Sequence, residues 1–461
     1  MRVASFPVQV ALVLVFTLVL PYVLIQLSPS ITRLLFPLYT LIVGVGVIVR
    51  WPCSYPAICV AFGTFSPFLR RVADYYAGFQ QTNPILLGPL VVLLPSLLWL
   101  SRRIFTRGAP MAGAFGLMTA CIAYGSVLAL FSDKLIQGLY EPAWWLLPPA
   151  LAAYVLEHGR HIDKIARAMG QTLIVVLPIM TVYGVLQFVA PLPWDLVWML
   201  NVDNATFGRP EPYGIRVFSM MNSPGTTSFF VAYAIIFMCG GSLLSTVMAI
   251  AALPLLMLTL VRTAWFSTAA GLLALALVGS GGKRMQLVLA LVGGASLIGV
   301  MMATPAVPIA IKNVVMDRVL SIGSLGTDSS ANDRRDTYAS FWDRLAVSPF
   351  GEGFGANGSA ISATQKRDLP ALDSGILESL LTFGVPIGCA YFVSLSMFVA
   401  ACWRGLKQSQ GKLAAAFGLL VAIVVDFPFG LSHVGEFTPL EWTAIGMLLV
   451  SSLRTETWRV A

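Results

Sequence analysis

Charged side chains are scarce in this chain. Asp, Glu, Lys and Arg together make up 11% of its 461 residues, whereas hydrophobic residues make up 57%. The mean hydropathy of +0.81 lies outside the range of soluble proteins of this length. Several apolar runs reach the roughly 17–25 residues that a helix needs to cross a bilayer. The composition therefore excludes an ordinary soluble protein and predicts an all-α integral membrane protein.

Cysteine and histidine are also few. The six cysteines lie in or beside apolar runs and form no Cys-x-x-Cys pair, which is typical of small core residues and not of a disulfide framework. Of the three histidines, His158 and His161 share a predicted cytoplasmic loop without further ligands nearby, which is too little for a metal site. We expect neither a metal nor a cofactor. The net charge of +8 comes from basic residues scattered between apolar runs, which argues against a nucleic-acid partner.

The apolar runs predict about 12–14 transmembrane helices in a single membrane domain, residues 1–461. The first run has one basic residue in front of it and no small-residue cleavage site behind it, so we interpret it as a span and not as a signal peptide. The weakest run, 54–69, is short, but removing it would place the arginines that follow the next span outside the cytoplasm. The predicted helices are 8–27, 34–49, 54–69, 85–101, 111–131, 142–157, 169–190, 226–240, 243–261, 264–280, 285–303, 373–403, 412–430 and 438–453.

Basic residues set the predicted orientation of the chain. With the N-terminus in the cytoplasm, most arginines and lysines between spans lie in inside loops, as the positive-inside rule requires. The short outside loops then hold only Arg33, Arg70, Arg71, Lys134 and Arg262. Two long loops, 191–225 and 304–372, are predicted to lie outside as well. Long loops over a membrane bundle are unusual unless they bind or react with something.

Three segments concentrate arginine on this predicted outer side. Arg216 lies in "GIRVFSMMNSPG" ahead of a span, and Arg262 lies in "VRTAWFS" between two spans with almost no loop around it. The third segment, "RRDTYASFWDRLAVSPFGEGFG", is a predicted amphipathic helix that carries Arg334, Arg335 and Arg344. Arginine supplies a permanent, planar charge with several donors, which suits phosphate oxygens. Alternatives stay open: Arg262 as an interfacial side chain that reaches water, Arg216 as an ordinary loop charge, and the helix arginines as contacts to lipid headgroups.

A glycine-rich turn and a late span follow the amphipathic helix. The turn "SPFGEGFG" lets the chain bend sharply or approach a ligand closely, but it lacks the lysine and hydroxyl residue of a nucleotide-binding loop. Asp373 opens "LDSGILESLLTFGVPIG", where it is a candidate proton acceptor, a candidate N-cap, or both. Glu378 in the same helix is expected to pair with an arginine. His433, ahead of the last span, is either a proton acceptor or a structural polar residue.

These four segments, in this order, resemble the O-antigen ligase and polysaccharide polymerase superfamily of bacterial inner-membrane proteins. The resemblance covers roughly residues 170–400, and the arginine helix that ends in a proline–glycine turn before Gly-x-Gly is its most specific part. It implies a multi-span glycosyltransferase that works without a metal. Members take a glycan carried on undecaprenyl diphosphate at the periplasmic face. They either join it to another repeat unit or transfer it to lipid A core.

The resemblance also implies site residues by motif position. The family arginines that contact the diphosphate correspond to Arg216, to Arg262, which is also expected to be catalytic, and to Arg335 or its neighbour Arg334. Ligases of the family have a His–Asn pair at the start of the late span, where this chain has Asp373 followed by Ser374. This departure favours a polymerase, with Asp373 as the base, over a ligase.

The expected reaction joins repeat units in the periplasm. An acceptor hydroxyl attacks the anomeric carbon of the donor, and the arginines stabilise the charge on the departing diphosphate. The expected partners are the undecaprenyl-diphosphate-linked glycan, membrane lipids, and a flippase and chain-length regulator of the same pathway. The alternatives are an O-antigen ligase, a flippase or transporter for a lipid-linked glycan, and a structural assembly subunit. A transporter should carry ionisable residues near the bilayer midplane, where Asp426 is the only clear candidate acid in a late span.

Overall fold

The computed structural model describes residues 2–131, 135–202, 207–279, 341–355, 374–409, 413–431 and 434–457, together with positions 282, 292, 293, 296, 299 and 338. About 81% of the structure is helical, and its described residues contain no strand, only one isolated bridge between Gly208 and Ile215. Among the described residues, six helices are long and apolar enough to cross a membrane. The protein is therefore an all-α integral membrane protein, as the composition predicts.

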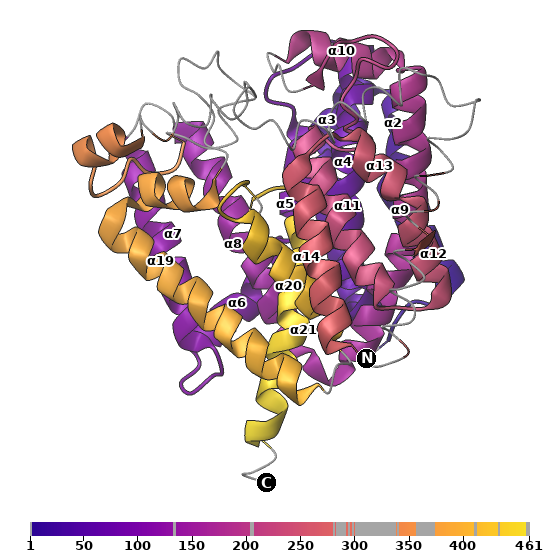
Figure 1. Ribbon diagram of the computed structural model, residues 1–461. Coiled ribbons are helices and arrows are strands. Elements are labelled where there is room, and N and C mark those ends of the chain that lie inside the picture. The colour runs from indigo at the N-terminus through magenta and orange to yellow at the C-terminus, as the bar shows by residue number, and fades with distance from the viewer. Residues whose placement is uncertain are drawn as a thin grey trace.

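The helices form one bundle whose long members run side by side (Figure 1). Short 3-10 or π segments join α1 to α2 and α5 to α6 into longer apolar runs. A further helical segment covers residues 341–347. In chain order the named helices are α1 (Phe6–Ala11), α2 (Leu20–Leu27), α3 (Pro29–Arg50), α4 (Tyr55–Ala77), α5 (Gly88–Val91), α6 (Leu97–Phe105), α7 (Ala112–Leu130), α8 (Leu135–Glu157), α9 (Ile162–Val189), α10 (Pro193–Asn201), α11 (Pro224–Cys239), α12 (Leu243–Ala251), α13 (Leu253–Leu258), α14 (Arg262–Val278), α19 (Gly375–Gln408), α20 (Ala414–Asp426) and α21 (Thr438–Thr457).

The predicted spans coincide with these helices where the chain is described. The weakest prediction, 54–69, is a helix, but α4 continues beyond it to Ala77. The predicted helix 285–303 and most of the loop 304–372 lie outside the described residues. Apolar runs locate the spans well because a chain in lipid must satisfy its backbone hydrogen bonds within each helix.

Helix α4 is enclosed by protein over most of its length. Every residue from Tyr55 to Asp74 is buried, and the helix packs against α3, α9, α10 and α21. An ionisable side chain on such a helix faces other protein groups and not lipid, which is where charged residues in membrane bundles are tolerated. The charges of α4 therefore belong to the interior of the bundle.

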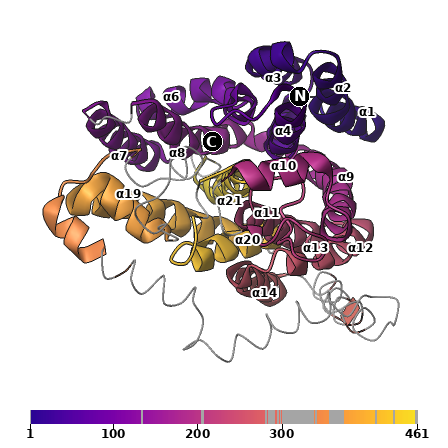
Figure 2. The same cartoon turned by 90° about the horizontal axis from the view of Figure 1, so that it is seen from above.

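The two ends of the bundle are distinct. Both chain termini lie at one end, and α10 lies across the other (Figure 1). We call the latter the α10 end; it is the side that the basic residues predict to be outside. Seen from above, α20 and α21 lie between α19 and α11 (Figure 2), and these helices are in contact. The segments after α9, before α11 and before α21 all meet at the α10 end.

Candidate functional site

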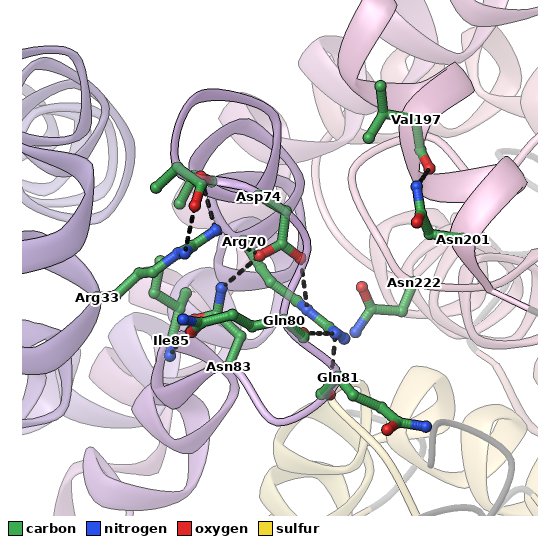
Figure 3. Close-up of polar contacts among 12 residues, drawn as sticks. Arg33, Arg70, Asp74, Gln80, Gln81, Asn83, Ile85, Val197, Asn201 and Asn222 are labelled. Carbon is green, nitrogen blue, oxygen red and sulfur yellow. Dashed lines mark hydrogen bonds and ion pairs between the residues drawn. The ribbon is translucent and has the colours of Figure 1, made fainter. Parts of the chain in front are cut away.

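Three arginines are buried at the α10 end of the bundle. Two of them share one carboxylate: Asp74 Oδ1 lies 2.7 Å from Arg33 Nη2, and Oδ2 lies 3.2 Å from Arg70 Nε (Figure 3). Asn83 Nδ2 also donates to Asp74 Oδ1, at 2.8 Å. None of the three charged side chains is more than 4% exposed. Because two guanidinium groups surround a single carboxylate, this cluster keeps a net positive charge.

The guanidinium of Arg70 reaches past Asp74 toward the end of α4. Its Nη2 donates to the backbone oxygens of Gln80 and Gln81, at 2.8 and 3.1 Å (Figure 3). Its carbon Cζ lies 4.3 Å from the ring centroid of Trp198 in α10, a cation–π contact. The remaining nitrogen, Nη1, has no hydrogen-bond partner in the described part of the chain.

Arg71, the next residue of α4, forms a second buried ion pair. Its Nε donates to Asp195 Oδ1 in α10 at 2.9 Å, and both side chains are 0% exposed. Its two terminal nitrogens donate to the backbone oxygens of Ser219 and Met221. Tyr183 completes the arrangement by donating its hydroxyl hydrogen to Asp195 Oδ2 at 2.7 Å. Arg71 thereby binds the "FSMMNSPG" segment to α4.

These positions correct one sequence prediction. The prediction that Arg33, Arg70 and Arg71 occupy short outside loops is wrong, because α3 and α4 extend through them. Local sequence does contain a signal for the longer helix. Arg70 and Asp74 are four residues apart, the spacing at which an ion pair stabilises a helix.

Arg216 lies at the junction where Arg262 begins α14. Its Nε and Nη2 donate to the backbone oxygens of Thr259 and Leu260, both at the long distance of 3.4 Å. Leu260 has a left-handed backbone (φ 57°), which allows the chain to reverse between α13 and α14. Arg216 and Arg262 are both partly buried. The structure therefore brings together two of the segments that the sequence singles out.

The amphipathic helix packs on α19. Phe341 and Leu345 are 1% and 8% exposed and contact Leu377 and Leu381. Trp342, on the other side of the segment, is 65% exposed. The apolar stripe thus fastens this segment to the first turns of the late span.

Of the three arginines in this third segment, only Arg344 lies in the described part of the chain. Arg344 Nη2 lies 2.6 Å from Glu352 Oε2, so this predicted phosphate contact forms an ion pair within its own segment. Arg334 and Arg335 lie outside the described residues, and their contact with a diphosphate stays a prediction.

The glycine turn after this helix packs against a break in α19. Gly384 has φ 73° and interrupts the helix. Hydrogen bonds run from Glu352 N to Leu381 O, from Gly353 N to Thr382 O and from Val385 N to Pro349 O, at 2.7, 3.1 and 2.9 Å. A Cβ on Gly384 would lie 2.5 Å from Gly351 N, so only glycine fits. These glycines therefore serve the contact between two parts of the backbone.

The start of the late span corrects another prediction. Ser374, not Asp373, is the N-cap of α19, and its hydroxyl accepts a hydrogen bond from Leu377 N at 3.4 Å. Asp373 itself lies outside the described residues, as does His433. Glu378 lies in the first turn of α19 and is 3% exposed, so its carboxylate is buried.

The sequence does not predict Glu436 as a candidate site residue at the α10 end. Glu436, in the segment between α20 and α21, accepts a hydrogen bond from Asn222 Nδ2 at 3.3 Å. The charge of Arg70 acts on both Glu436 and Tyr140 of α8. A single glutamate in a short loop gives no local pattern, and the nearby His433 is the more conspicuous residue in the sequence.

A cavity of about 370 Å³ lies at the other end of the bundle. It is lined by Asp163, Arg167 and Gln171 near the start of α9, and by the segment around Ser242. Arg216 lies near the far end of α9, where Tyr213 N donates to Phe188 O. The length of α9 therefore separates this cavity from the arginines of the α10 end.

No family model matches this chain, and no curated protein matches it either. The described residues contain no group of three or more His, Cys, Asp or Glu side chains that could hold a metal ion. All six cysteines are free, and five of them are buried. The functional argument therefore depends on the chemistry of the α10 end.

Proposed function

We propose that this protein is a membrane glycosyltransferase that polymerises undecaprenyl-diphosphate-linked repeat units. The proposal depends on one observation above all: Arg216 lies against the last carbonyls before α14, and Arg262 is the first residue of that helix. Two partly buried guanidinium groups at one helix start favour a ligand with more than one negative charge.

The helix itself adds to this preference. The first backbone N–H groups of α14 have no side-chain cap, because the N-cap residue is Val261. A helix N-terminus carries partial positive charge and binds phosphate through its free N–H groups. A diphosphate placed here would meet both arginines and the helix start.

The chemistry follows from the charge that develops in the reaction. The acceptor hydroxyl attacks the anomeric carbon of the donor, and the carbon–oxygen bond to the lipid diphosphate breaks with its electron pair on the phosphate. Positive groups fixed before the reaction stabilise that charge without reorganising. By motif position the family resemblance offers Asp373 as one candidate proton acceptor, and it places the reaction at the periplasmic face of a bacterial inner membrane. The periplasmic location remains part of the proposal.

Replacing Arg262 with alanine tests the proposal. In purified protein supplied with the lipid-diphosphate-linked repeat unit of its host, this change is expected to slow chain growth on the order of 10²–10³-fold, the effect of losing one charge-stabilising donor. Arg216→Ala is expected to act in the same direction. The control is Arg209→Ala, because Arg209 lies in the same loop but is 84% exposed.

Two outcomes would contradict this function. Normal chain growth in both Arg262→Ala and Arg216→Ala, with unchanged thermal unfolding, would remove the arginines from the site. Repeat units trapped on the cytoplasmic leaflet of cells that lack the protein would instead support a flippase.

A further inference from the structure

Four polar side chains from separate segments lie together at the α10 end. Glu436 precedes α21, Asn222 precedes α11, Tyr140 belongs to α8, and Arg70 belongs to α4. Asn222 donates to Glu436 Oε1, and Arg70 acts electrostatically on Glu436 and Tyr140. In Figure 3 the side chain of Asn222 points toward the guanidinium end of Arg70. We call these four residues the Glu436 cluster.

Two features hold the backbone around Glu436 in place. The backbone carbonyl oxygen of Glu436 lies directly against Gly63 of α4, so a Cβ at position 63 would collide with it. Gly435 has φ 131°, and its oxygen accepts hydrogen bonds from both the hydroxyl and the N–H of Thr438, at 2.7 and 3.2 Å. A residue whose backbone is held by a tight turn and by α4 presents its side chain from a fixed position.

The cluster keeps polar atoms that no group in the described part of the protein satisfies. Within the described part of the chain, Arg70 Nη1 has no hydrogen-bond partner although the residue is only 1% exposed. Asn222 Oδ1 is buried without a partner as well. Glu436 is partly exposed, and its only described neighbour in a side-chain hydrogen bond is Asn222. Buried polar groups are normally paired, so the open Asn222 Oδ1, beside a partly exposed carboxylate, indicates a polar ligand.

A sugar hydroxyl matches this set of groups. It donates one hydrogen bond and accepts others, so it pairs with a carboxylate and a guanidinium at the same time. The segment that carries Asn222 also carries Arg216, so the cluster and the α14 junction are linked by a short piece of chain. The place for a hydroxyl and the place for an anion are therefore served by one short segment of the chain.

We propose that Glu436 is a catalytic residue of the transferase proposed above: its carboxylate takes the proton from the acceptor hydroxyl. The acceptor oxygen forms its bond to the anomeric carbon as its O–H bond breaks. The proton moves to Glu436 and then to water, and the electron pair of the broken bond leaves on the lipid diphosphate. Asn222 orients the carboxylate, and Glu436 takes the role that the family resemblance gives to Asp373.

The surroundings suit Glu436 to this task. Burial raises the pKa of the Glu436 carboxyl, while its own backbone N–H, Asn222 and Arg70 oppose the shift. Among the described residues, the titratable groups beside it besides Arg70 are Tyr140 and, next to Tyr140, Glu141. A base works best when its pKa lies near the working pH. Because the ionised form is the active one, turnover should rise with pH through a pKa above the ordinary glutamate value.

The test is the turnover of Glu436→Gln in purified full-length protein, with the lipid-diphosphate-linked repeat unit of the host as substrate. We expect kcat to fall about 10²–10⁴-fold with KM little changed, as for loss of a general base. The rise of the remaining activity with pH should also disappear. Glu211→Gln, at a 56% exposed glutamate of the same loop as Arg209, is the matched control.

The outcomes separate this inference from the function on which it rests. A wild-type protein that does not lengthen the glycan overturns both. If Arg262→Ala is inactive but Glu436→Gln keeps wild-type turnover, the function stands and the role of Glu436 is wrong. If Glu436→Gln does not fold, Glu436→Asp retains the charge one methylene shorter and should lose part of kcat while keeping the pH dependence. A rise in KM alone in that variant would overturn the catalytic role.

Discussion

Replacing Asp195 with alanine is expected to lower the free energy of unfolding by about 3–5 kcal/mol, the usual effect of removing one partner from a buried ion pair. The change would leave Arg71 charged at a position that is 0% exposed. Tyr183 would lose the acceptor of its hydroxyl hydrogen at the same time. Thermal or denaturant unfolding of the purified protein in micelles measures the effect.

Two further variants serve as controls for the Asp195→Ala result. Glu211→Ala breaks the ion pair between Arg209 and Glu211, whose side chains are 84% and 56% exposed. This change should leave the free energy of unfolding unchanged, because exposed ion pairs contribute little to it. The double variant Arg71→Met with Asp195→Leu removes both charges and should recover much of the loss. Equal stability of Asp195→Ala and the wild type would show that the pair does not stabilise the bundle.

Replacing Gly384 with alanine is expected to separate the glycine turn from α19. The backbone at φ 73° alone makes a side chain cost about 1–3 kcal/mol. The new Cβ would also lie 2.5 Å from Gly351 N, which does not yield as a flexible side chain would. Hydrogen exchange at the amides of Glu352 and Gly353, which donate to α19, should therefore accelerate.

Gly46→Ala in α3 is the matched control for this change. An added Cβ at Gly46 meets nothing within 4 Å, so the variant should unfold like the wild type or slightly later. If Gly384→Ala showed the same stability and unchanged exchange at the turn, the contact between the turn and the helix break would not hold this region together.

The sequence predicts the spans well and their charged contacts poorly. Each apolar run must form a closed helix in lipid, so composition alone locates most of the bundle. The burial of Arg71 depends on Asp195, which lies 124 residues later in the chain, and no local pattern connects them. The positive-inside rule places Arg33 and Arg70 in loops because it counts charges but does not pair them.

The sequence predicts part of the candidate site as well. The arginine segments could be picked out because Arg216 and Arg262 stand next to predicted spans on one side. Arg216 contacts the turn before Arg262 because the backbone at Leu260 is left-handed. A leucine in the sequence does not predict such a backbone. Glu436 could not be found at all, because its significance comes from Asn222 and Arg70, which lie on other helices or segments.

The enclosed charges of α4 have a consequence for how the protein enters the membrane. An unpaired arginine costs roughly 2.5–3.5 kcal/mol at the centre of a membrane helix on insertion scales, and less near a helix end, where Arg70 and Arg71 of α4 lie. During synthesis Arg33 and Asp74 become available early, but the carboxylate that neutralises Arg71 emerges 124 residues after it. We therefore expect α4 to reach its final depth late, together with α9 and α10, which makes biogenesis of this bundle a cooperative event and not a helix-by-helix one.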